Sequence, residues 1–148
     1  MFFKRRKALN YRQHVAVGTI LGIATQYSTK LPMSGSLLAY PSYYGGVILG
    51  SLLPDIDHPK SYLGRQLPFI SVPIFKLFGH RGFTHSLLSL SILGVATAKY
   101  WAVNPLLWGG LLLGYFSHIL ADMCTPSGVP LFYPHKKRYK FFKKRNKK

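Results

Sequence analysis

The acidic residues of this 148-residue chain are three aspartates, and there is no glutamate. Asp55 and Asp57 lie in the stretch LPDIDHP, and Asp122 lies in SHILADM. Pro54 and Pro59 disfavour helix between them, and in an extended segment Asp55 and Asp57 point to the same side. Two carboxylates that close repel each other unless a cation or a proton lies between them. The pattern therefore favours a bound divalent metal ion.

Histidines accompany these acids in two motifs. In SHILAD, His118 and Asp122 are spaced i, i+4, so on a helix they share one face with Cβ atoms about 5–6 Å apart. This spacing suits either shared metal binding or a hydrogen bond between two buried polar groups, and by itself it does not decide between them. In GHRGFTHSLL, His80 and His85 flank Arg81, and the glycine between them suits a loop that folds back before a helix capped by a Thr or Ser.

We expect a metal site built from these motifs. Mixed imidazole and carboxylate ligands suit one or two zinc ions, with manganese or iron as alternatives. The planar guanidinium of Arg81 suits a substrate anion, and we expect His58 to shuttle protons or to support a ligand. His14 is added to the predicted ligands because it directly precedes the first apolar run. The predicted metal ligands are His14, Asp55, Asp57, His80, His85, His118 and Asp122.

Four apolar segments must position these side chains, at residues 15–28, 37–53, 86–103 and 105–121. A bilayer span needs about 20 mostly apolar residues. The two later runs have no polar stripe beyond Ser, Thr and Gly, which are common in packed membrane helices. A buried core of soluble helices is the alternative. We predict an all-α, multi-pass membrane bundle of about four transmembrane helices with a cytoplasmic loop, in which residues 66–79 lie along the membrane interface.

The basic residues set the expected orientation of these spans. The formal net charge is +17, and eighteen of the twenty Lys and Arg fall on one side if the N-terminus is cytoplasmic. The positive-inside rule therefore favours a membrane protein with both termini cytoplasmic. An uncleaved first span is preferred to a signal peptide, because no clear small-x-small cleavage site follows it. The same helix directions bring all three carboxylates to the cytoplasmic face.

The chain has room for one domain. We expect a basic N-terminal segment at residues 1–13, a membrane-embedded metal-site domain at 14–134 and a basic cytoplasmic tail at 135–148. The tail is expected to contact anionic lipid headgroups, and a nucleic-acid partner is disfavoured. The single cysteine, Cys124, excludes an internal disulfide. The oligomeric state is left open, with GGLLLG at 109–114 as a hint of helix association.

The order of His14, PDIDH, SYLGR, HRGFTHSLL and SHILADMCTPSG resembles the YdjM-like family of small multi-pass bacterial proteins, described as membrane-bound metal-dependent hydrolases. That family is in turn thought to be distantly similar to zinc-dependent phospholipase C and P1 nuclease, in which an HxxxD pair and scattered His and Asp side chains hold a zinc cluster. The resemblance covers about residues 14–134, and it implies a location in the bacterial inner membrane. It implies that Asp57 is either a further ligand or the base that orients the attacking water. It also implies these ligands: His14, Asp55, His80, His85, His118 and Asp122.

The expected function is metal-dependent hydrolysis of an ester or phosphoester at the cytoplasmic membrane face. A lipid-linked substrate is expected because the site lies at the level of the headgroups. Two alternatives stay open. One is a metal-free membrane histidine phosphatase with His85 as the nucleophile and the pair of His118 and Asp122 as the base. The other is a non-enzymatic membrane protein with a structural or sensory metal site.

Overall fold

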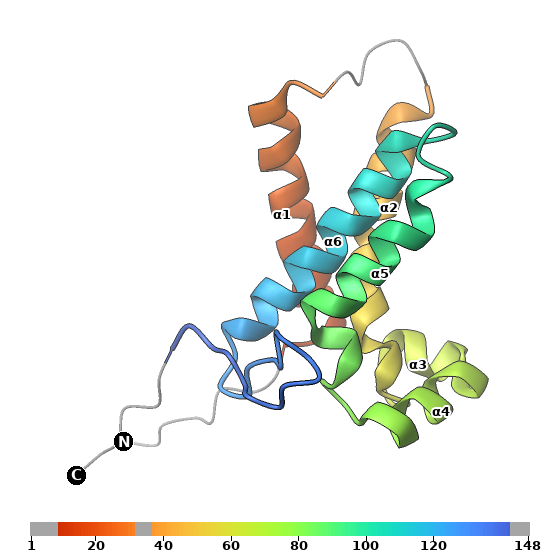
Figure 1. Ribbon diagram of the computed structural model, residues 1–148. Helices are drawn as coiled ribbons and strands as arrows, with labels where there is room; N and C mark the ends of the chain where they lie inside the picture. The colour runs from red at the N-terminus through yellow and green to blue at the C-terminus, as the bar shows by residue number, and fades with distance from the viewer. Residues whose placement is uncertain (1–8, 32–36, 143–148) are drawn as a thin grey trace.

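The computed structural model describes residues 9–31 and 37–142 of the chain. Within these ranges the fold is all-helical, without β-strands, and one isolated antiparallel bridge joins Val129 to Tyr139. The predicted all-α class is confirmed. Four helices run side by side as a bundle (Figure 1). They are α1 (Tyr11–Thr29), α2 (Ala39–Leu52), α5 (Leu87–Ala98) and α6 (Pro105–Met123).

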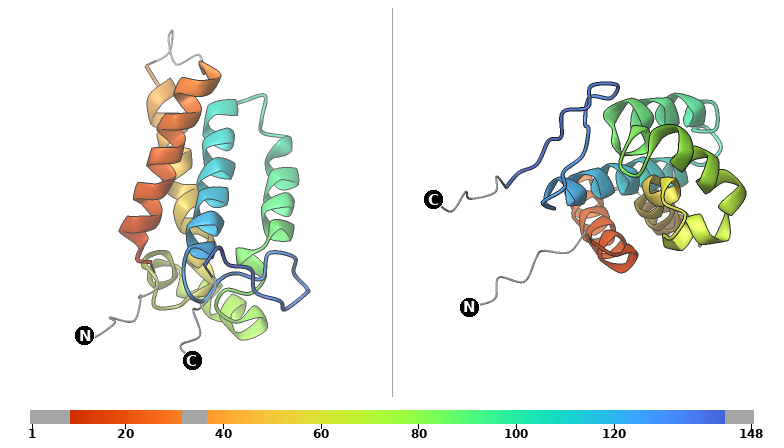
Figure 2. Two further views of the ribbon diagram at one scale, coloured as in Figure 1. Left: turned by 90° about the vertical axis from the view of Figure 1, so that its left-hand side faces the viewer. Right: turned by 90° about the horizontal axis from the view of Figure 1, so that it is seen from below.

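The shorter elements gather at one end of this bundle, which is the lower end in Figure 1 and in the left view of Figure 2. The segment after α6 lies at the same end. We call this end the site end, because α1 and α5 begin there and α2 and α6 finish there. The short elements are η1 (Leu53–Asp57), α3 (Tyr62–Gln66), α4 (Pro68–Phe78) and η2 (Phe83–His85).

Side-chain caps define where the bundle helices begin. Asn10 caps α1 by accepting a hydrogen bond from the backbone N–H of Gln13, whose side chain accepts one from the Asn10 N–H in return. Ser86, one of the two caps that the sequence allowed beside Thr84, caps α5 by accepting from the Ser89 N–H. These caps satisfy backbone donors that a helix start leaves unpaired. They place the first turns of both helices at the site end.

The stretch LPDID is a 3₁₀ helix and not the extended segment expected from its two prolines. The expectation was wrong because Pro54 lies in the first turn of η1, where no intrahelical donor is needed. His58 then adopts an extended conformation, with φ −119° and ψ 107°, and ends the element. Asp57 is buried and Asp55 is half-buried, so both aspartates are still withdrawn from solvent.

Glycines bring α2 and α6 into backbone contact. A Cβ atom on Gly46 or Gly50 would lie 2.2 or 2.0 Å from a carbonyl oxygen of α6. Conversely, a Cβ on Gly110 or Gly114 would lie 2.2 or 2.1 Å from a carbonyl oxygen of α2. Such close approach is the usual purpose of small residues in packed membrane helices. The glycines of the GGLLLG run that face α2 therefore serve contacts within the chain.

The lengths of the helices bear on the four predicted spans. Among the described residues, α6 is the one helix that is long and apolar enough to cross a membrane. The third predicted span, 86–103, contains only the 12 residues of α5, about 18 Å at 1.5 Å per residue against a hydrocarbon core of about 30 Å. Helix α4 forms within the predicted interfacial segment 66–79. Crossing by all four helices stays a prediction, as do the domain boundaries near residues 13 and 135.

Many of the buried side chains of the bundle are polar, beside two small hydrophobic clusters, and much of its exterior is apolar. More polar and charged side chains than hydrophobic ones are buried among the described residues. Large hydrophobic side chains are instead exposed along the bundle helices, including Ile20, Leu49, Ile92 and Val95, the last 78% exposed. A water-soluble protein has the opposite distribution, and exposed apolar surface of this extent marks contact with a membrane or a partner.

Candidate metal centre

The structure brings all seven predicted metal ligands together at the site end. They form three overlapping groups, and within each group the candidate ligand atoms lie within 4.8 Å of one another. Each side chain lies in or next to an element that begins or ends at the site end. His14 is in α1, Asp55 and Asp57 are in η1, His80 follows α4, His85 is in η2, and His118 and Asp122 are in α6.

Four of the ligand atoms face one another at the centre of the cluster. His85 Nε2 lies 3.3 Å from His118 Nε2 and 3.3 Å from Asp122 Oδ2. Asp55 Oδ1 lies 3.6 Å from each of the two imidazole nitrogens, and Asp122 Oδ2 lies 3.7 Å from His118 Nε2. Ligands of a tetrahedral zinc ion at about 2.0–2.1 Å lie roughly 3.3–3.4 Å apart. These five distances are close to those between the ligands of a tetrahedral zinc ion, and imidazole nitrogen and carboxylate oxygen are ligands that zinc accepts.

Both histidines of this set are oriented through their other ring nitrogen. His118 Nδ1 donates to the carbonyl oxygen of Ser51 at 2.6 Å. His85 Nδ1 lies 3.2 Å from Asp57 Oδ2 and 3.0 Å from Thr84 Oγ1. Such bonds fix the tautomer and the ring plane of a metal-binding histidine. In each case Nε2 is the nitrogen left to face the cluster.

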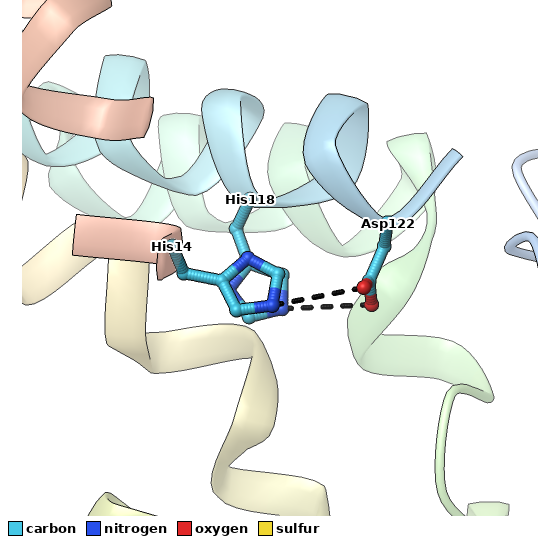
Figure 3. Close-up of side chains that lie close together, drawn as sticks. All are labelled: His14, His118 and Asp122. Atoms are coloured by element: carbon cyan, nitrogen blue, oxygen red, sulfur yellow. Dashed lines mark ion pairs between the residues drawn. The ribbon is translucent and has the colours of Figure 1, made fainter. Parts of the chain in front are cut away.

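His14 approaches the same group from α1. Its ring stacks on the His118 ring with centroids 3.7 Å apart and an interplanar angle of 9°, and its Nε2 lies 3.6 Å from Asp122 Oδ1 (Figure 3). Both rings point their Nε2 atoms towards the Asp122 carboxylate. His14 is 1% exposed. Its buried Nδ1 has no hydrogen-bond partner within residues 9–31 and 37–142.

Asp57 is fully buried and contacts the segment of residues 80–85 at several points. Its Oδ2 accepts a hydrogen bond from the Arg81 backbone N–H at 2.9 Å and another from Thr84 Oγ1 at 2.5 Å. Its Oδ1 lies 2.9 Å from His80 Nδ1. Arg81 has a left-handed backbone, with φ 58°, which costs a non-glycine residue about 1–2 kcal/mol. The bond to Asp57 helps to stabilise that turn, so Asp57 shapes the loop that carries His80 and His85.

The guanidinium of Arg81 is buried against Asp122. Its Nη2 lies 2.6 Å from Asp122 Oδ1 and its Nη1 donates to Thr125 Oγ1 at 2.9 Å. Arg81 is 5% exposed. This arrangement neutralises one carboxylate of the cluster and leaves the other oxygen, Oδ2, facing the histidines. The predicted binding of a substrate anion by Arg81 stays a prediction, and in this structure the guanidinium pairs with Asp122.

His58 lies at the half-exposed edge of the cluster. Its ring centroid is 4.5 Å from that of His80, and the two planes are inclined by 47°. Burial, together with the neighbouring His80, lowers the pKa of His58 below its usual value. A neutral imidazole at this edge can accept a proton. The predicted role of His58 in proton transfer stays a prediction.

The charges of the buried groups depend on one another. Burial lowers the pKa of His85, but contacts with Asp122, Asp55 and Asp57 outweigh it and raise the pKa well above the usual value. Burial likewise raises the pKa of Asp55 and of Asp57, but the contacts with His85 and the neighbouring histidines outweigh it and hold both pKa values far below normal. The carboxylates therefore stay ionised and draw a cation towards His85. In the metal-free protein this cation is the proton on His85, and a divalent ion can take the place of that proton.

A buried polar atom without a hydrogen-bond partner also indicates a metal ion in the cluster. Asp122 Oδ2 is buried and, in the part of the chain that the structure describes, accepts no hydrogen bond of acceptable geometry. A buried carboxylate oxygen without a donor is costly. Its neighbours, His85 Nε2 and His118 Nε2, are nitrogens that bind divalent metals when neutral. A cation among these three atoms would satisfy all of them.

Two polar residues that support the cluster were not identified as such from the sequence. Thr84 donates to Asp57 and contacts His85. Tyr115 donates to the Thr84 carbonyl oxygen at 2.5 Å, and its hydroxyl oxygen lies 3.0 Å from Ser89 Oγ. Thr84 could have been found from its place inside HRGFTHS. Tyr115 could have been found from its spacing, because it lies three residues before His118 and so shares a face of α6.

Fold and site together define a helical protein with an apolar exterior and a buried His/Asp cluster at one end of its bundle. The sequence profile of the YdjM inner membrane protein family matches residues 9–147, so the chain belongs to that family. The resemblance based on PDIDH, HRGFTHSLL and SHILADMCTPSG is thereby confirmed as far as the family. The inner-membrane location agrees with the family's description.

Two relatives have substantial identity. Inner membrane protein YdjM of Escherichia coli strain K12 is 53% identical over 97 residues, which are 63% of this chain and 50% of that protein. Uncharacterized protein YvsG of Bacillus subtilis strain 168 is 40% identical over 86 residues, 58% of this chain and 53% of that protein. The chain thus spans about half the length of the curated relatives it matches. No solved structure matches it.

Proposed function

We propose that this inner membrane protein is a metal-dependent hydrolase that acts on an ester or phosphoester at the cytoplasmic membrane face. One observation carries the proposal: His85 Nε2, His118 Nε2, Asp55 Oδ1 and Asp122 Oδ2 lie 3.3–3.7 Å apart in the pairs given above. Zinc suits such mixed ligands, and manganese or iron are alternatives. A divalent ion bound there would supply Lewis-acid chemistry and a water of lowered pKa.

The residues around the ligands hold this site in one geometry. Asp57 and the Ser51 carbonyl oxygen orient His85 and His118, and Arg81 neutralises one oxygen of Asp122. His58 and His80 lie at the half-exposed edge, where a substrate has access and a proton can be passed to solvent. We infer that His58 exchanges protons there. The distant similarity to zinc-dependent phospholipase C and P1 nuclease belongs to this proposal.

A lipid-linked substrate follows from the surroundings of the site. Lys60, Arg65 and Lys76 lie in or between η1, α3 and α4, which gather at the site end. Lys30 and Lys99 follow the last residues of α1 and α5, at the opposite end of the bundle. Anionic headgroups are attracted to such basic clusters. An apolar cavity of about 780 Å³ lies between α1 and α6, towards the opposite end, and is lined by Leu106, Leu113 and Phe116 among others. These features fit an anionic head at the site and an apolar chain alongside the helices.

The metal-free alternative, with His85 as a nucleophile, is disfavoured by burial. His85 is 0% exposed, and its Nε2 faces two carboxylates and His118, so no open path leads an electrophile to that atom. The non-enzymatic alternative has a specific observation in its favour. Most of the central ligands are fully buried, as in closed structural metal sites. The proposed hydrolase and this non-enzymatic alternative differ in whether the bound ion supports any hydrolysis.

The function is tested with the purified protein in detergent, using a chromogenic phosphodiester, a carboxylic ester and a fluorescent phospholipid as probes. We expect stoichiometric metal by elemental analysis, hydrolysis of at least one probe, loss of hydrolysis in chelator and recovery on adding zinc. Asp122→Ala should lose both metal and hydrolysis. Hydrolysis that survives in chelator would support the histidine phosphatase. Bound metal with no turnover of any probe would support the structural or sensory role.

The orientation can be tested with the native cysteine. Cys124 ends α6 at the site end and is exposed. We expect a membrane-impermeant maleimide to label it in inverted membrane vesicles and not in spheroplasts. The matched control is Lys30→Cys in a Cys124→Ser background, because Lys30 ends α1 at the opposite end of the bundle. It should label in spheroplasts only. Labelling of both positions from the same side would contradict the proposed topology.

A further inference from the structure

We propose that the cluster holds two divalent ions, and that the second ion is bound on the solvent side by Asp55, Asp57 and His80. This inference rests on the proposed metal-dependent function and assigns six of the seven candidate ligands, all but His14, to two sites. The inner site consists of Asp55 with His85, His118 and Asp122. The outer site consists of Asp55, Asp57 and His80, whose candidate ligand atoms all lie within 4.8 Å of one another. Asp55 belongs to both sets and is the shared ligand.

The two sites differ in their access to solvent. The side chains of His85, His118 and Asp122 are 0% exposed. In the outer set, His80 is 32% exposed and Asp55 is 19% exposed. Three of the four inner ligands are fully buried, whereas two of the three outer ligands, His80 and Asp55, are partly exposed. Metal sites with three protein ligands and an open position are the ones that bind water and substrate. The outer ion is therefore the one that a substrate can reach.

The outer set has a carboxylate oxygen available for an ion. Asp57 Oδ2 is engaged by the Arg81 backbone N–H and by Thr84. In the described part of the chain, the polar partner of Asp57 Oδ1 is the half-exposed His80, whose Nδ1 lies 2.9 Å away. Neutral imidazole can bind an ion through the nitrogen that now faces Asp57. Replacing this one contact requires no change in the buried bonds that hold the loop.

The charges of the cluster determine what a second ion would add to the site. Within residues 9–31 and 37–142, one salt bridge joins a Lys or Arg to an aspartate of the cluster, and it is the pair of Arg81 and Asp122. Asp55 and Asp57 face only histidines and neutral or backbone donors. One divalent ion would compensate the two remaining carboxylates. A second would make the centre cationic, which gives it the attraction for a substrate anion that the buried Arg81 is not placed to provide.

The test is the metal content of protein purified with a tag that contains no histidine. We expect about two ions per chain in the wild type and about one in His80→Ala. The half-exposed position of His80 makes this variant the least disruptive choice, and circular dichroism checks that its helices are retained. His135→Ala is the matched control, because His135 is exposed and lies outside the three ligand groups. It should keep two ions.

A second measurement covers the inner site. Stepwise addition of Co²⁺ to metal-free wild type should give strong visible absorption with the first equivalent, from a tetrahedral buried site, and a distinct weaker change with the second. A wild type that saturates at one ion, or a His80→Ala that keeps two, would overturn the inference. Two ions without any hydrolysis would leave this inference standing and contradict the proposed function. One ion with chelator-sensitive hydrolysis would do the reverse.

Discussion

The substitution Gly50→Ala tests whether the packing of α2 on α6 positions the candidate metal centre. A Cβ atom at residue 50 would lie 2.0 Å from the carbonyl oxygen of Leu111, whereas real contacts of this kind are essentially never below 3.0 Å. The two backbones must therefore separate by roughly 1 Å, since neither atom belongs to a flexible side chain. The next residue, Ser51, accepts the bond from His118 Nδ1 at 2.6 Å. The same separation would lengthen this bond beyond hydrogen-bonding distance.

The expected magnitude combines three effects. Overpacking costs about 1–3 kcal/mol, and a buried bond left unpaired costs about 1–3 kcal/mol. The higher helix propensity of alanine returns about 1 kcal/mol. We therefore expect the free energy of unfolding to fall by roughly 1–5 kcal/mol from these ranges. Because His118 loses the bond that orients it, metal affinity should fall by about 10–100-fold.

The assay compares unfolding in detergent, followed by circular dichroism, with metal affinity measured by competition against a chelator. Gly45→Ala is the matched control in the same helix, because a Cβ there meets no atom within 4 Å. It should leave metal affinity unchanged and stability equal or slightly higher. The reasoning is refuted if Gly50→Ala behaves as Gly45→Ala does in both measurements.

Two further outcomes are expected. Thr84→Val removes the hydroxyl that contacts Asp57 and His85, so metal affinity should fall by about tenfold or more. The control is Thr97→Val, which removes bonds to carbonyl oxygens of its own helix. Equal metal affinities in the two variants would contradict this role of Thr84. In metal-free protein, the raised pKa of His85 contributes stability that is present below about pH 6.5 and is lost as the pH rises through its folded pKa. The lowered pKa values of Asp55 and Asp57 contribute stability that is present above about pH 3.9 and is lost as the pH falls through their folded values. The free energy of unfolding of the metal-free protein should thus be greatest between about pH 4 and 6.5. Zinc affinity should rise with pH, because the ion competes with the proton on His85. A stability of the metal-free protein that rises steadily above pH 7 would contradict this charge assignment.

Much of the candidate site could be predicted because its residues lie at helix ends with readable patterns. The i, i+4 spacing of His118 and Asp122, the loop between His80 and His85, and the cap at Ser86 each depend on a few neighbouring residues. The helix directions, inferred from Lys and Arg, placed these ends together. Local sequence was sufficient for these features because each follows from backbone geometry.

The features that were missed depend on contacts between distant segments. The pairing of Arg81 with Asp122, 41 residues apart, decides whether the guanidinium faces solvent. The glycines of α2 and α6 could not be assigned to contacts within the chain until both helices were placed. The 3₁₀ turn at Leu53–Asp57 was misjudged because two flanking prolines were taken to exclude any helix, although a first-turn proline is compatible with one. Sequence patterns specify the ends of elements better than the partners they meet.

X-ray absorption spectroscopy of the purified protein at the metal edge tests the central claim most directly, namely that His and Asp side chains from distant elements bind one cation centre. We expect stoichiometric metal, a first shell of nitrogen and oxygen at about 2.0–2.2 Å, and outer-shell scattering from imidazole. The account would be contradicted by metal at trace level only. It would also be contradicted by sulfur at about 2.3 Å, which would assign the ion to Cys124.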